Sequence, residues 1–169
     1  RVTAANVLNT ITVALRARVP FTEFSYVQVL VALLYLGLNL ACLYVGMTPR
    51  SYAVNWGYLA AGNLFVVMLP ATRSSALLFF LGYSLDQVIW FHRYVGRLLV
   101  LYVTVHMALY WVEWLEQEGN IDATFSSLDE EEPRKNLWGF VAWCALVFIT
   151  ITSVEWVRRK WFEAFLYSH

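Results

Sequence analysis

A stretch without charged residues, from Phe24 to Val45, constrains the fold of this chain more than any other feature. As a helix it is long enough to cross about 30 Å of hydrocarbon, at about 1.5 Å per residue. Only 14% of the 169 residues are charged and 60% are hydrophobic, whereas a soluble domain carries about 25% charged residues. The sequence therefore predicts an integral membrane protein of the all-α class, a multi-pass bundle of transmembrane helices.

More apolar segments follow this first span. We expect spans and a last apolar segment at residues 54–69, 85–114, 137–157 and 161–169. The connecting segments are expected to be a turn, an interfacial helix and an acidic loop, at residues 46–50, 76–81 and 116–136. Residues 1–23 mix apolar and polar positions, which predicts an amphipathic surface segment or the end of a preceding span. The chain is therefore divided into that segment and a transmembrane domain, residues 24–169.

The basic residues predict the orientation. They gather in three places that lie on one side if the spans alternate, namely Arg16 with Arg18, Arg73, and Arg158-Arg159-Lys160. Loops rich in Lys and Arg usually face the cytoplasm. The acidic loop 116–136 and Arg50 then face outward, as expected for a plasma-membrane protein. The helix 85–114 and the last segment both run from inside to outside.

Two histidines on the helix 85–114 are the main candidates for a site. His92 and His106 lie fourteen residues apart, which returns to within about 40° of the same helix face at a rise of about 21 Å. A neutral imidazole is a common ligand of haem iron, and an ionisable residue inside a membrane is costly. The spacing suits two stacked b-type haems, although a proton relay, another metal or a structural role remains possible from spacing alone.

Four more residues share the face of the two histidines. They are Gly96, Leu99, Val103 and Tyr110. Gly96 would leave room for a flat ring, and the two aliphatic residues would fill the gap between two macrocycles. The alternative for each is ordinary helix packing.

The second axial ligands are expected on the last segment. His169 lies at a depth similar to that of His92, because both helices start at the cytoplasmic face. We therefore pair His92 with His169 on an inner haem. His106 would hold an outer haem, with a partner histidine expected about a dozen residues beyond His169.

Other polar residues in the spans have two interpretations each. Arg93 and Arg97 would bind haem propionates, or Arg93 would reach lipid headgroups. Asn63 is expected to form an interhelical hydrogen bond or to contact a ligand. Cys42 and Cys144 have no metal-site spacing and are expected to be buried thiols.

Three motifs in order resemble the transmembrane family of ferric reductases and NADPH oxidases. The first is Trp56-Gly-Tyr-Leu-Ala-Ala-Gly-Asn63 with Leu69-Pro-Ala-Thr-Arg73. The second is His92-Arg-Tyr-Val-Gly-Arg97 followed by His106, and the third is Arg158-Arg-Lys-Trp-Phe-Glu-Ala-Phe-Leu-Tyr-Ser-His169. The resemblance covers about residues 54–169. Many members have Arg where this chain has Asn55, which weakens an oxidase assignment, and Arg50 would be a substitute.

The resemblance implies a six-helix bundle that holds two bis-histidine b haems. The last helices of that bundle are expected to be truncated in this chain. It also implies a cytoplasmic FAD- and NADPH-binding dehydrogenase region, fused or separate, whose motifs this chain does not contain. Electrons would pass from NADPH and FAD to an acceptor outside.

We expect that acceptor to be ferric iron, with no catalytic acid or base and no nucleic-acid partner. The alternatives are an NADPH oxidase that makes superoxide from oxygen, and a haem-free channel or transporter whose histidines relay protons.

Overall fold

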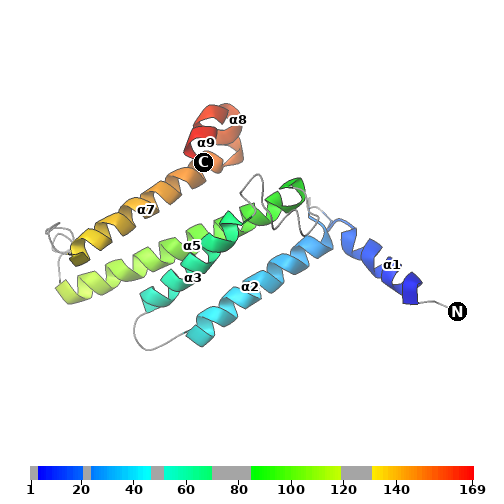
Figure 1. Ribbon diagram of the computed structural model, residues 1–169, viewed down its shortest axis with the longest axis horizontal. Coiled ribbons are helices and arrows are strands. Elements are labelled where there is room, and N and C mark those ends of the chain that lie inside the picture. The colour runs from blue at the N-terminus through cyan, green and yellow to red at the C-terminus, as the bar shows by residue number, and fades with distance from the viewer. Residues whose placement is uncertain (1–3, 21–23, 47–51, 70–84, 119–130) are drawn as a thin grey trace. The chain divides into compact units, whose positions relative to one another are not determined.

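A computed structural model of the chain describes residues 4–20, 24–46, 52–69, 85–118 and 131–169 (Figure 1). These residues are helical, apart from short connections and one isolated bridge between Arg18 and Ser25. The chain divides into two compact units, the N-terminal unit Arg1–Val45 and the C-terminal unit Gly46–His169, and each is described by itself. The predicted all-α class is confirmed. Some predictions lie outside the described residues. They are those for the turn after Gly46, including Arg50, and those for Arg73 and the helix 76–81.

The N-terminal unit contains α1 (Ala4–Arg16) and α2 (Tyr26–Gly46). Ser25 and Gln28 start α2 with a capping box. The Ser25 amide donates to Gln28 Oε1 at 2.9 Å, and the Gln28 amide donates to Ser25 Oγ at 3.4 Å. The span predicted from Phe24 to Val45 is therefore confirmed as a helix.

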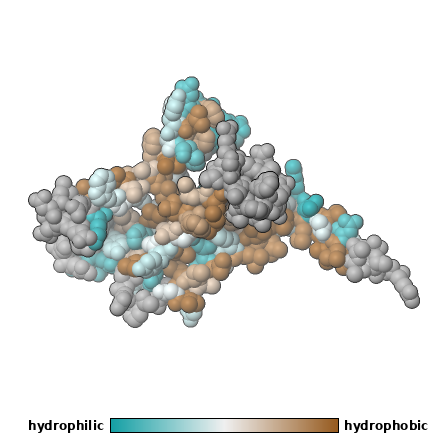
Figure 2. Space-filling model, in the orientation of Figure 1, coloured by the Kyte–Doolittle hydropathy of each residue, from teal (hydrophilic) through white to brown (hydrophobic). Residues whose placement is uncertain are grey.

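The surface of this unit is apolar. Large hydrophobic side chains are exposed along α2, and Figure 2 shows them as an almost continuous brown surface. Cys42, which we expected to be buried, is exposed on this helix. On α1 the hydrophobic side chains Val7, Leu8, Ile11 and Val13 are exposed among polar ones. A position of α1 on the membrane surface remains a prediction.

The core of the C-terminal unit is the antiparallel pair α3 (Tyr52–Met68) and α5 (Leu85–Glu118), which lie side by side in Figure 1. The buried side chains at this contact are those of Ala53, Ala60, Asn63 and Val67 from α3, and Val95, Leu99, Tyr102 and Met107 from α5. Small residues on α3 let the two backbones approach closely, as is common between membrane helices.

The next helix, α7 (Glu131–Ser153), packs antiparallel to the second half of α5. Trp143 donates from Nε1 to Thr104 Oγ1 at 3.2 Å, and Trp111 contacts the Phe140 ring. The loop 116–136 is shorter than predicted, because α5 continues to Glu118 and α7 begins at Glu131. Pro133, which indicated a turn, lies in the first turn of α7, where a missing N–H costs little.

Three helices are long and apolar enough to cross a membrane, among the described residues: Tyr26–Gly46, Val88–Glu116 and Lys135–Ser153. The 17-residue helix α3 is shorter but packs along one of them. The chain is therefore an integral membrane protein.

The fourth predicted span ends earlier than expected. Instead of continuing to Val157, α7 ends at Ser153, and Val154 has an extended conformation with φ −59° and ψ 133°. Hydroxyl groups next to the break bond to backbone carbonyls of the preceding turn, Thr152 to Phe148 and Ser153 to Ile149. Such bonds compete with the helical pattern and often bend helices.

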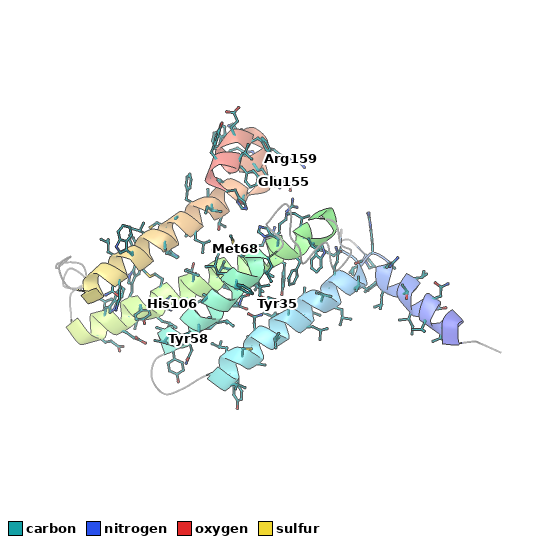
Figure 3. The ribbon with its side chains drawn as sticks, in the orientation of Figure 1. Tyr35, Tyr58, Met68, His106, Glu155 and Arg159 are labelled. Atoms are coloured by element: carbon teal, nitrogen blue, oxygen red, sulfur yellow. The ribbon has the colours of Figure 1, made fainter. Side chains whose placement is uncertain are left out.

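Two short helices follow the break, α8 (Glu155–Lys160) and α9 (Phe162–Ser168). In α8, Glu155 pairs with Arg159, as Figure 3 shows. Both side chains are well exposed, 65% and 77%, so the pair contributes only about 0.5 kcal/mol. α9 returns along the end of α7, where the hydroxyl groups of Thr152 and Ser168 are 2.7 Å apart.

Candidate functional site

Both histidines of α5 bond to the backbone of α3. His92 Nδ1 lies 3.0 Å from the Val67 carbonyl oxygen, and His106 Nδ1 lies 2.6 Å from that of Ala53. Figure 3 shows His106 on α5 where it runs beside α3. A carbonyl oxygen only accepts hydrogen bonds, so each Nδ1 must carry a proton and donate it. The neutral ring then presents the lone pair of Nε2, and this arrangement is typical of metal-binding histidines.

The two bonds repeat at the same interval on both helices. Ala53 and Val67 are fourteen residues apart, as are His92 and His106. Because α3 and α5 are antiparallel, equal spacing brings both pairs into register. One helix therefore orients both imidazoles.

The carbonyls of Val67 and Ala53 lie at opposite ends of α3. Val67 lies in the last turn of α3, where backbone carbonyls have no partner within the helix. His92 therefore also caps the end of α3. Ala53 lies in the first turn of α3 and its side chain is fully buried against the neighbouring helix.

His169 lies beside His92, and the haem that they are predicted to share stays a prediction. The two ring centroids are 6.1 Å apart and the rings are inclined by 69°. Ser153 Oγ lies 3.1 Å from His169 Nδ1. The break at Val154 makes this contact possible, because it lets α9 return along α7 and bring His169 back to Ser153.

The ring separation of this pair fits one metal ion between two imidazoles. Each metal–nitrogen bond is about 2.0 Å long, so two rings bound through Nε2 on opposite sides have centroids roughly 6 Å apart. The separation of 6.1 Å agrees with this value. No group of three or more His, Cys, Asp or Glu forms a metal site within the described ranges. A haem needs no such group, because its porphyrin supplies the other four nitrogens.

Aromatic rings follow His106 along the second half of α5. The Tyr110 ring meets it edge-on, with centroids 4.9 Å apart and planes at 87°, and Trp114 follows 5.5 Å from Tyr110. No second histidine lies opposite His106 within the described residues, and the predicted partner lies beyond His169.

The residues between the two histidines differ in burial. Leu99 is buried at 3% exposure and Val103 is half-buried. At Gly96 an added Cβ would meet Val67 at 3.8 Å, which is an ordinary contact. Packing against α3 therefore does not require glycine at this position.

Replacing Gly96 by Leu separates the two interpretations of this glycine. If a haem lies against it, Gly96→Leu is expected to lower the affinity for that haem about 10-fold or more, by analogy with other losses around metal sites, and so to lower the haem content of the purified protein toward half. Thermal unfolding of the same variant measures its packing separately. Full haem content in the variant would leave Gly96 as a packing residue.

The remaining candidates are placed as follows. Arg93 and Arg97 are exposed on α5. Asn63 is buried, and its amide donates to the Leu59 carbonyl of its own helix at 2.8 Å. Contacts of these three residues with a cofactor stay predictions. Asn55 has a buried Nδ2 without a hydrogen-bond partner among the described residues.

Sequence reasoning missed the residues that hold the histidines in place. Backbone carbonyls, such as those of Ala53 and Val67, carry no side-chain signature. Ser153 had a signal, because it is a hydroxyl residue at the end of an apolar run before three bases.

Comparison with known proteins identifies the family of the chain. The model of the ferric reductase-like transmembrane component matches residues 56–169, which include all three histidines. The chain belongs to this family. The predicted resemblance is therefore confirmed for the part of the chain that carries the site.

Similar proteins bear related names. A probable ferric reductase transmembrane component of Eremothecium gossypii is 34% identical over 139 residues, which is 82% of this chain and 19% of the relative. Probable ferric reduction oxidase 1 of Arabidopsis thaliana is 28% identical over 110 residues, 64% of this chain and 15% of the relative. Ferric reductase transmembrane component 6 of Saccharomyces cerevisiae is 26% identical over 122 residues, 71% of this chain and 16% of the relative.

The matched part of the chain spans less than a fifth of the length of these relatives. No solved structure matches the chain significantly.

Proposed function

We propose that this chain is the membrane part of a metalloreductase, which transfers electrons from cytosolic NADPH, by way of FAD, to ferric iron outside the cell. The observation that carries the proposal is the His92–His169 pair, with its ring separation of 6.1 Å and both Nδ1 atoms hydrogen-bonded. The names of several relatives, which refer to ferric reduction, support the choice of acceptor.

The three histidines would hold two b-type haems. His92 and His169 would bind the inner one, and His106 would bind the outer one together with a histidine beyond this chain. When bound, these groups would supply one-electron carriers at two depths of the membrane. FAD and NADPH would bind in a dehydrogenase region, fused or separate, on the cytoplasmic side.

The protein residues bind and orient in this proposal. The α3 carbonyls and Ser153 fix the imidazole orientation, and apolar side chains such as Leu99 keep water away. Transfer of a single electron to a metal ion needs no protein acid or base, so no catalytic residue is assigned.

An absorption spectrum of the full-length protein, purified in detergent, tests the proposal. A Soret band is expected, together with sharp α and β bands after reduction, because six-coordinate haem with two imidazole ligands is low-spin. The α band should consist of overlapping components from two haems. A colourless protein, expressed with an ample haem supply, would instead support a transporter with a histidine proton relay.

A further inference from the structure

The contact between Gly57 and His106 is the tightest that any glycine makes in the described part of the chain. A Cβ added to Gly57 would lie 2.6 Å from Cε1, 2.9 Å from Nδ1 and 3.3 Å from Nε2 of His106. At Gly62, on the same helix, an added Cβ would meet nothing within 4 Å. The imidazole therefore lies directly against the backbone of α3, at a place where a side chain would collide with it.

Helix geometry explains why glycine stands at this position. In an α-helix the carbonyl of residue i accepts the N–H of residue i+4, so the Ala53 carbonyl points toward Gly57. A side chain at position 57 would block the approach to that oxygen from the α5 side. Because glycine has no side chain, His106 Nδ1 comes within 2.6 Å of the Ala53 oxygen. The Nδ1–H donates to the second lone pair of that oxygen, whose first lone pair serves the helix.

We propose that Gly57 is a positioning residue for His106: its missing side chain lets the imidazole reach the Ala53 carbonyl and so directs Nε2 toward the outer haem iron. The inference rests on the proposed haem sites. His92 needs no such glycine for its own bond, because the Val67 carbonyl lies at the open end of α3.

The His106 ring has few other positions to which it could move if a methyl group were added at position 57. Tyr110 meets the ring edge-on at 4.9 Å, and Ala53, on the other helix, is fully buried. A methyl group at position 57 cannot be accommodated by a small shift of a flexible chain end, because the overlap involves the ring itself. The ring must rotate or the helices must separate, and either change lengthens or redirects the Nδ1 bond, which is 2.6 Å long here.

The test compares Gly57→Ala with Gly62→Ala in the full-length protein. Both variants make the same change in α3, but only the first adds an atom beside His106. Loss of an outer partner of a metal-binding histidine costs about 10- to 100-fold in metal affinity. Gly57→Ala is therefore expected to lose, or to shift in reduction potential, one of the two haem components in a redox titration. Gly62→Ala should keep both components unchanged.

A double variant covers the case in which Gly57→Ala does not accumulate. If the collision with His106 is the cause, Gly57→Ala combined with His106→Ala should accumulate as well as His106→Ala alone, because the ring is gone. Failure of the double variant to do so would overturn the inference.

Two further results would also contradict it. One is a Gly57→Ala protein with both haem components at their wild-type potentials, and the other is equal loss of both components from a folded protein. A wild-type protein without haem would instead refute the proposed function, so the two failures are distinguishable.

Discussion

His92→Ala and His169→Ala are each expected to remove the same haem, and His106→Ala is expected to remove the other. The reason is that the ring centroids of His92 and His169 lie 6.1 Å apart, so the two residues would form one ligand pair, whereas His106 lies about 21 Å further along the helix. Each single variant should lose about half of the haem absorbance, because each haem depends on its own pair of axial ligands. Haem per polypeptide and the reduced α-band position measure the result.

The double variant His92→Ala with His169→Ala sharpens this prediction. It should lose no more haem than either single variant, because the two residues serve one group. Leu101→Ala is a matched control on α5, since its side chain is 54% exposed. Additive losses in the double variant, or both haems retained in any single variant, would contradict the pairing.

Ferrous iron is expected to be the main product when the full-length protein receives NADPH with ferric iron in air. A hydride from NADPH carries an electron pair, and each ferric ion takes up one electron. The sequence places acidic residues, Asp129 to Glu132, in the segment expected outside. A field of this sign raises the local concentration of cations, by about 10-fold or more at low salt. Ferrous output should therefore fall as ionic strength rises.

The control for this experiment separates direct from indirect reduction, because superoxide itself reduces ferric iron. Ferrous output, measured with a ferrous-specific chelator, should persist without oxygen and in the presence of superoxide dismutase. His106→Ala should abolish it, because this residue would hold the haem nearest to the acceptor. Ferrous output that disappears with superoxide dismutase would identify oxygen as the acceptor and favour the oxidase.

Much of the fold could be predicted because a membrane limits the possibilities. An uncharged run such as Phe24–Val45 must be a helix in hydrocarbon, where every backbone polar group needs a partner. The similar depth of His92 and His169 followed from counting residues from the predicted cytoplasmic ends of two helices, and their ring centroids are 6.1 Å apart; their role as a ligand pair stays a prediction.

Other features depend on contacts that a single segment does not encode. The end of α7 was placed too late, because Val154 and Val157 are equally apolar and the break arises beside the hydroxyl bonds of Thr152 and Ser153. The acidic loop was predicted too long, because Glu131 and Pro133 suit a first helical turn as well as a loop. Gly57 was unremarkable until His106 lay against it.

The bonds from α5 to α3 have a consequence for assembly. These two helices follow one another in the chain, so both imidazoles are oriented within a helical hairpin that needs nothing from α7 or α9. His169 is synthesised later, so it meets a ring that already faces it. Under the proposed function, an inner haem bound by His92 and His169 would therefore wait for the synthesis of α9, and a nascent chain that stalls before His169 would hold two oriented imidazoles without the second ligand.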